Sequence, residues 1–185
     1  MNRVWKIRDS HPELRTSLAS SLNISPITAQ LLINRGINDE MQAHHFLYGD
    51  LSSSHDPFLL KDINKSIARI KRAIKGKENI LVYGDYDVDG ITAVALLHIV
   101  LTYLKANVTT HIPNRLEEGY GLNAGAVRIA HRKKISLIIT VDCGISAHKE
   151  IGLAGKFGID VIVTDHHEIK NNSLPKAHSD RKSVV

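Results

Sequence analysis

Acidic and histidine residues gather at three points of the chain that could supply ligands to metal ions. The three runs are Asp85-Tyr86-Asp87-Val88-Asp89-Gly90, Asp142-Cys143-Gly144 and Asp165-His166-His167-Glu168. Carboxylates crowded into a partly buried crevice lose hydration and repel one another, so divalent cations would relieve the conflict. A set of carboxylate oxygens and imidazoles favours manganese or magnesium, whereas a thiolate-rich set would favour zinc.

The spacing of the first run suggests that one strand tip serves two ions. Alternate residues of an extended strand point to the same side, so Asp85, Asp87 and Asp89 are expected to face one crevice. Asp142 arrives from another strand and is expected to bridge the ions. Two ions about 3.5–4 Å apart can hold both the attacking and the leaving oxygen of a phosphoryl displacement, with water as the nucleophile. The pattern therefore indicates phosphoester hydrolysis.

Each aspartate taken alone has a simpler structural explanation. Aspartate is a common helix N-cap residue, and Asp-Gly is a common turn, so capping is an equal alternative at any single position. The three acidic runs each follow an apolar stretch, and this coincidence favours a shared site. Cys143 is expected to be a small buried side chain beside that site.

An alternation of strands and helices from residue 79 onward is expected to position these runs. Strands are predicted at 79–83, 108–112, 137–141 and 160–164, and helices at 91–105, 123–134 and 146–157. Apolar runs such as 80–82, 137–139 and 161–163 do not alternate with polar residues, which is typical of strands covered on both faces. The fold class is therefore predicted as α/β, a doubly wound parallel sheet preceded by a small helical segment. Such sheets bind ligands at the carboxyl ends of their strands.

The chain before this alternation is predicted to be helical. Ser10 and Glu13 have capping-box spacing, and Ser25-Pro26 is expected to open a second helix that Gly36 closes. A third short helix is expected near 41–47, and Asp62 is expected to cap a fourth. The helical lead-in is assigned to residues 1–56, and it meets the rest of the chain in a stretch rich in serine.

Composition excludes several classes of protein. The chain has 185 residues, 43% of them hydrophobic, and a net charge of +5 from 24 basic and 19 acidic residues. This mild basic excess favours a polyanionic partner only slightly. A single cysteine, no apolar leader and no long apolar run predict a cytoplasmic protein with no membrane role.

Four segments together resemble the DHH phosphoesterase superfamily, and most closely its bacterial exonucleases specific for single-stranded DNA. They are the segments 83–92, 113–122, 140–146 and 163–168, which contain Tyr-Gly-Asp-Tyr-Asp-Val-Asp-Gly, Pro-Asn-Arg-Leu-Glu-Glu-Gly-Tyr-Gly-Leu, Val-Asp-Cys-Gly and Asp-His-His-Glu. The helical lead-in also resembles that of these exonucleases. The order and spacing of the segments make the resemblance specific.

The resemblance implies a ligand set. Asp87 and Asp89 would each bind one ion, and Asp142 would bridge the two. His166 would complete the ion held by Asp89, and Asp85 is a further candidate for the shell.

Other residues would act on the substrate or support the ligands. His167 would face the scissile phosphate, and Asp165 would orient the histidines through a hydrogen bond. Arg115 and Tyr120 would approach the substrate phosphate or base. A turn that merely packs beside the crevice is an equal alternative for their loop.

The implied function is two-metal hydrolysis of single-stranded DNA from its 5′ end, in DNA repair and recombination. Two divalent cations are expected, Mn²⁺ ahead of Mg²⁺. The partners would be single-stranded DNA and proteins such as a single-strand-binding protein or a helicase, and the oligomeric state is undefined. The alternatives are another DHH phosphoesterase, acting on oligonucleotides, cyclic dinucleotides or pyrophosphate, and an inactive remnant or binding module.

The resemblance extends over about residues 1 to 176. Residues 57–177 are assigned to the amino-terminal part of a DHH phosphoesterase domain, and residues 178–185 to an atypical tail that does not look like the strand expected there. The chain is therefore interpreted as truncated relative to the family, without a later metal-binding aspartate and later domains. A sheet edge exposed in this way would favour self-association.

Overall fold

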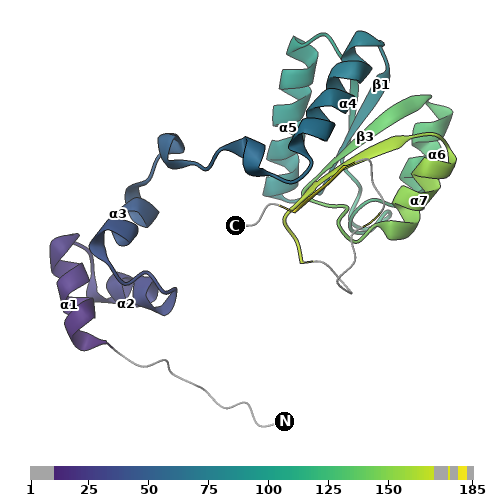
Figure 1. Ribbon diagram of the computed structural model, residues 1–185. Helices are drawn as coiled ribbons and strands as arrows, with labels where there is room; N and C mark the ends of the chain where they lie inside the picture. Colours follow the sequence, from purple (N-terminus) through teal and green to yellow (C-terminus); the bar gives the residue numbers. More distant parts are fainter. Residues whose placement is uncertain (1–10, 169–174, 176–178, 183–185) are drawn as a thin grey trace, which may run out of the picture. The chain divides into compact units, whose positions relative to one another are not determined.

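The computed structural model describes residues 11–168, 175 and 179–182, and divides the chain into two compact units, residues 1–55 and 56–185 (Figure 1). The first unit holds the helices α1 (Pro12–Ser21), α2 (Pro26–Asn34) and α3 (Glu40–Tyr48), followed by the short 3-10 helix η1 (Leu51–Ser53). A small apolar core joins its helices and includes Leu18, Leu32 and Ala43.

Helix ends in the first unit agree only partly with the expectations from sequence. Ser25 caps α2 by accepting a hydrogen bond from the Thr28 N–H at 3.0 Å, as predicted. Helix α1 begins instead with His11 at the N-cap position, and the expected cap residue Ser10 lies outside the described residues.

The second unit is built on a parallel sheet. Its elements are η2 (Pro57–Leu59), α4 (Ile63–Lys75), β1 (Asn79–Gly84), α5 (Val88–Tyr103), β2 (Asn107–His111), α6 (Ala124–Arg132), β3 (Ile135–Val141), α7 (His148–Lys156), β4 (Asp160–Asp165) and β5 (Ser179–Lys182). The strand order is β2-β1-β3-β4-β5, and every paired neighbour is parallel. The predicted doubly wound α/β sheet is confirmed.

Alternate residues of the strands pack into two separate cores. One core holds Ile80, Val82 and Leu137 beneath α4 and α5, and the other holds Leu81, Tyr83 and Ile138 beneath α6 and α7. Figure 1 shows these helix pairs on opposite faces of the sheet. Both faces of the central strands are therefore buried, which explains the continuous apolar runs of β1, β3 and β4.

Two features near the ends of the second unit differ from the sequence prediction. Residues 179–182, assigned to an atypical tail, form β5 and pair with β4. A parallel edge strand needs only backbone hydrogen bonds on one side, so its polar sequence gave no signal. Asp62 precedes α4 but makes no capping hydrogen bond with its side chain, because its backbone is left-handed (φ 57°) and its carboxylate pairs with Lys65 at 2.8 Å.

A buried arginine ties the amino end of the sheet together. Arg69 of α4 is 4% exposed, and it donates to Asp160 at the start of β4 and to Glu78, just before β1, at 2.5 and 2.6 Å. It also donates to the Ser136 carbonyl oxygen at 3.3 Å. One guanidinium thus links the starts of three strands.

Candidate metal centre

The turn between β1 and α5 brings two aspartates to the carboxyl end of the sheet. Asp85 is 2% exposed, and one of its carboxylate oxygens accepts the Tyr86 N–H at 2.8 Å. Asp87 is the N-cap of α5, and its Oδ1 accepts the N–H groups of Asp89 and Gly90, both at 3.0 Å. The Gly90 N–H is the leading reason why the pKa of Asp87 is lowered. Capping and a role in the cluster therefore coexist at Asp87.

Gly90 allows this turn to close tightly. A Cβ atom on Gly90 would lie 2.4 Å from the carbonyl oxygen of Asp85 and 2.6 Å from its nitrogen. Backbone atoms cannot yield as a side-chain end can, so a larger residue would displace Asp85. The glycine in this acidic run thus sets the approach of α5 to β1.

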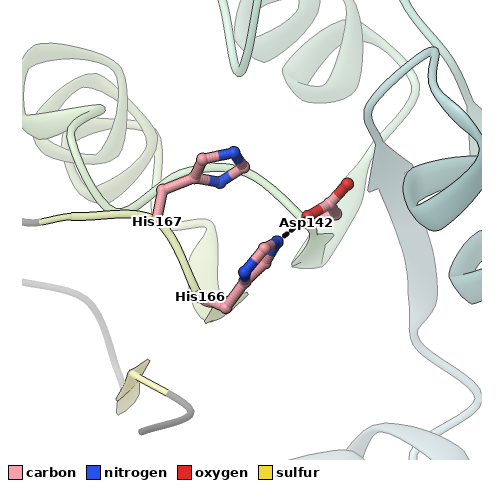
Figure 2. Close-up of side chains that lie close together, drawn as sticks. All are labelled: Asp142, His166 and His167. Atoms are coloured by element: carbon pink, nitrogen blue, oxygen red, sulfur yellow. Dashed lines mark hydrogen bonds and ion pairs between the residues drawn. The ribbon is translucent and has the colours of Figure 1, made fainter. Parts of the chain in front are cut away.

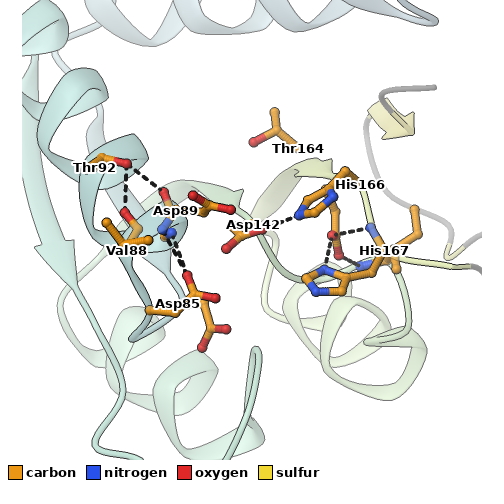
Figure 3. A network of polar contacts seen from close by, with 12 residues as sticks. Asp85, Val88, Asp89, Thr92, Asp142, Thr164, His166 and His167 are labelled. Atoms are coloured by element: carbon orange, nitrogen blue, oxygen red, sulfur yellow. Dashed lines mark hydrogen bonds and ion pairs between the residues drawn. The ribbon is translucent and has the colours of Figure 1, made fainter. Parts of the chain in front are cut away.

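Asp89 does not lie where the sequence prediction placed it. The expected extended strand tip, with Asp85, Asp87 and Asp89 on one side, is wrong because α5 begins at Val88 and turns Asp89 into its first helical turn. Asp89 lines an open hollow of about 400 Å³ with Ala93, Val141, Asp142, Thr164, Asp165 and His166. Figure 3 shows it on the α5 side of that hollow. It therefore borders the cluster from a helix.

Asp142 lies at the centre of the cluster. It follows β3 with a left-handed backbone (φ 58°), and its N–H donates to the Thr164 carbonyl oxygen at 2.9 Å. Its Oδ1 lies 2.9 Å from Nε2 of His166 (Figure 2), whereas its buried Oδ2 has no hydrogen-bond partner. Burial, and next the neighbouring Asp87, raise the pKa of the Asp142 carboxyl. The lone pairs of this buried oxygen accept no hydrogen bond and could therefore bind a cation.

Asp165 fixes the position of His167. Its Oδ1 accepts the backbone N–H of His167 at 3.0 Å and lies 2.7 Å from His167 Nδ1, while its Oδ2 accepts the Ile145 N–H at 2.9 Å. Asp165 is 4% exposed, and its hydrogen bond is the leading cause of a raised His167 pKa. Figure 3 shows both histidines beside Asp142.

The loop between β2 and α6 brings two further predicted residues near this cluster. The Tyr120 hydroxyl lies 3.3 Å from Nε2 of His167, and burial raises the pKa of this phenol. The Arg115 guanidinium carbon lies 5.2 Å from the centroid of the Tyr86 ring. Sequence reasoning did not single out Tyr86, although its place between two acids at a strand end was an available signal.

The donor atoms fit divalent cations. Two groups each have ligand atoms within 4.8 Å of one another, and they are Asp85 with Asp87 and Asp142, and Asp142 with His166 and His167. Asp142 belongs to both groups and carries the unpartnered oxygen. Neither group contains Asp89, and the second contains both histidines. Oxygen with imidazole is the donor chemistry of Mn²⁺ and Mg²⁺ sites.

The fold and the acidic cluster define a class of protein, and similarity to known proteins identifies it. Residues 79–182 match the family model described as DHH family, N-terminal domain, and the chain belongs to this family. A particular relative is the single-stranded-DNA-specific exonuclease RecJ of Bacillus subtilis, 42% identical over 164 residues, which are 89% of this chain and 21% of that protein.

Solved structures give the same result. A manganese-bound exonuclease RecJ is 39% identical with a TM-score of 0.61, covering 65% of this chain and 31% of that chain. RecJ from Thermus thermophilus in complex with Mn²⁺ is 28% identical with a TM-score of 0.65, covering 91% and 23%. The resemblance inferred from the four segments is confirmed, and this chain spans about a fifth to a third of the length of these relatives.

The described part of the chain holds no helix long and apolar enough to cross a membrane.

Proposed function

We propose that this chain supplies the metal-binding part of a phosphodiester hydrolase that degrades single-stranded DNA from its 5′ end, in DNA repair and recombination. The observation that carries the proposal is the position of Asp142, which is shared by both donor groups and has one buried oxygen without a hydrogen-bond partner. The names of the RecJ relatives found by sequence support the choice of single-stranded DNA as the substrate.

In this proposal the side chains have distinct tasks. Asp142 would be the ligand shared by two cations, Mn²⁺ ahead of Mg²⁺, which Asp85, Asp87 and His166 would also help to hold. When bound there, such cations would supply an activated water and stabilise charge on the phosphoryl group. His167 faces the scissile phosphate, and Asp165 holds its ring through Nδ1. Asp89 joins the cluster from α5, and Arg115 and Tyr120 contact the substrate.

The test is a cleavage assay with a matched pair of variants. Labelled single-stranded and duplex DNA are incubated with the chain in Mn²⁺, in Mg²⁺ and after chelation. Asp142→Asn removes the shared ligand, and Glu117→Gln removes one exposed charge from the nearby loop as a control. Mn²⁺-dependent shortening of single strands from the 5′ end, lost only in Asp142→Asn, is the expected result.

Other outcomes separate the alternatives. Cleavage of short oligonucleotides, cyclic dinucleotides or pyrophosphate without cleavage of the long single strand would assign the chain to another DHH activity. Mn²⁺ binding without any cleavage would identify a binding module or remnant that retains the cluster. Calorimetry that detects no Mn²⁺ binding to the wild-type chain would overturn the proposal.

A further inference from the structure

Tyr86 lies between the metal-site acids and the loop that follows β2. It separates the buried Asp85 from the N-cap residue Asp87, and its side chain is half-buried. Its ring lies beneath the Arg115 guanidinium, 5.2 Å from the guanidinium carbon, and 6.4 Å from the Tyr120 ring at an interplanar angle of 80°. One aromatic ring therefore contacts both residues proposed to meet the substrate.

The backbone around Arg115 is fixed, but its charge is not neutralised. The Asn114 N–H donates to Glu118 at 3.0 Å, the Leu116 N–H donates to the Asn114 side chain at 3.0 Å, and the Glu118 N–H donates to the Asn114 carbonyl oxygen at 2.8 Å. Arg115 itself is exposed and makes no ion pair with the described residues. Its contact is the Tyr86 ring.

The type of partner determines what the guanidinium can still bind. A carboxylate engages the N–H groups of arginine edge-on and in pairs. An aromatic ring lies against the flat face instead and leaves those N–H groups free for the oxygens of a phosphate. A ring partner thus holds the arginine without using its hydrogen-bonding edge.

The contacts continue from this ring to the cluster. Tyr120 packs edge-on against His167, with ring centroids 5.8 Å apart, and its hydroxyl lies 3.3 Å from the His167 nitrogen Nε2. Arg115, Tyr86, Tyr120 and His167 therefore form a continuous series of contacts in that order. The free edge of Arg115 is held at one end of this series, and the cluster at the other.

We infer that Tyr86 is a positioning residue, whose ring holds the Arg115 guanidinium beside the metal centre so that Arg115 binds a phosphate of a nucleic-acid strand. This inference rests on the proposed function, because it takes Arg115 as a substrate contact. It adds Tyr86, through which Arg115 acts, and it predicts an energetic dependence between the two residues.

A double-mutant cycle on binding tests this dependence. The probe is thymidine 5′-monophosphate, titrated into the chain with Mg²⁺ by calorimetry. Arg115→Ala is expected to weaken binding about tenfold or more, because a charge-assisted hydrogen bond is lost. Tyr86→Leu is expected to weaken it about three- to fivefold, the range of an exposed cation–π contact, whereas Tyr86→Phe stays within about twofold.

The decisive comparison uses the double variant. In the Arg115→Ala background, Tyr86→Leu is expected to cost nothing further, because the ring then has no guanidinium to hold. An equal loss in both backgrounds, or no loss in the wild-type background, would overturn the positioning role. Mn²⁺ titration of Tyr86→Leu checks that the cluster is intact, since a general disturbance would also weaken metal binding.

A second measurement does not depend on the substrate or on the folding of Tyr86→Leu. In the wild-type chain, the Arg115 side-chain NMR signals are expected to shift upfield through the ring current of Tyr86. Absence of this shift would disprove the contact and the inference, whatever the nucleotide does. The shift could be present while the wild-type chain binds no thymidine 5′-monophosphate. In that case Arg115 is not a phosphate-binding residue, and the inference that Tyr86 positions it for phosphate binding fails as well.

Discussion

The two ends of the parallel sheet both gather acidic side chains, but they balance the charge in different ways. At the amino end, Glu78 and Asp160 share the buried guanidinium of Arg69. At the carboxyl end, Asp85, Asp142 and Asp165 are each at most 6% exposed. Their hydrogen-bond partners among the described residues are histidine rings and backbone N–H groups, with no lysine or arginine. The first end carries its own cation.

This difference distinguishes an acid whose charge is balanced inside the chain from an acid that is proposed to bind a cation. An acid paired inside the chain has its hydrogen bonds satisfied and gains little from an added ion. An acid with a buried unpartnered oxygen, as at Asp142, gains when a cation arrives. Changes at the two ends are therefore expected to affect different quantities, stability at the amino end and metal affinity at the carboxyl end.

Asp142→Asn is expected to produce the largest effect. Mn²⁺ affinity should fall at least about a hundredfold, since even partners outside the ligand shell change affinity by about 10–100-fold. Metal-free unfolding free energy should stay equal or rise by about 0.5–2 kcal/mol, because a repelled buried charge is removed. Calorimetry and denaturant titration measure both quantities. Retention of wild-type Mn²⁺ affinity would show that Asp142 is not a shared ligand.

Arg69→Met is expected to give the opposite pattern. The unfolding free energy should fall by about 2–3 kcal/mol, because Glu78 and Asp160 lose their buried partner, while Mn²⁺ affinity of the folded chain is unchanged. Arg72→Met is the matched control, since that side chain is 64% exposed and 3.6 Å from Asp160, and should change stability by less than about 0.5 kcal/mol. An equal loss of unfolding free energy in Arg69→Met and Arg72→Met would show that the buried guanidinium does not specifically stabilise the amino end of the sheet.

Gly90→Ala is expected to affect both quantities. Its Cβ atom would meet the Asp85 backbone at 2.4 Å, so we expect a loss of about 2 kcal/mol of stability and about tenfold weaker Mn²⁺ binding. Gly152→Ala in α7 is the control, because nothing lies within 4 Å of an added Cβ, and it should gain about 0.5–1 kcal/mol. Unchanged metal binding in Gly90→Ala would mean that the turn can relax without moving the acids.

Glu118→Gln is expected to have the smallest effect, and it depends on pH. The Asn114 N–H, and next His111, lower the pKa of Glu118, so its ionised form stabilises the fold. This stability is present above the ordinary glutamate range and is lost as pH falls through the lowered pKa. At neutral pH the variant should be less stable by under about 1 kcal/mol. Melting curves at acidic and neutral pH test this, and a difference that persists in acid would contradict it.

The sequence predicted most of the sheet, because β1, β3 and β4 contain continuous apolar runs that need cover on both faces. The helices α5, α6 and α7 were also found, since each lies between two strands in the predicted alternation. The polar strand β5 was not found, because an edge strand is held by backbone bonds that no side-chain pattern reveals.

Within the site, residue types were predictable but their geometry was not. Asp142 and His166 do meet as adjacent strand ends require, at 2.9 Å. The predicted position of Asp89 was wrong because helix α5 already begins at Val88, the residue before Asp89. The alternation of side chains along a strand therefore does not apply to Asp89. Tyr86 was overlooked because its contact with Arg115 depends on a loop that lies far away in sequence, between β2 and α6.

The left-handed backbone of Asp142 limits which substitutions at this position leave a folded chain. Asparagine is the other common residue that tolerates this conformation, and it has nearly the same shape. Most replacements here would strain the chain and lead to its degradation, which removes the product from the cell. Asp142→Asn would instead be expected to accumulate as a folded, abundant and inert chain, able to occupy the partners of the normal protein. Cellular abundance of that variant beside Asp142→Val would test this expectation, and similar abundance of the two would refute it.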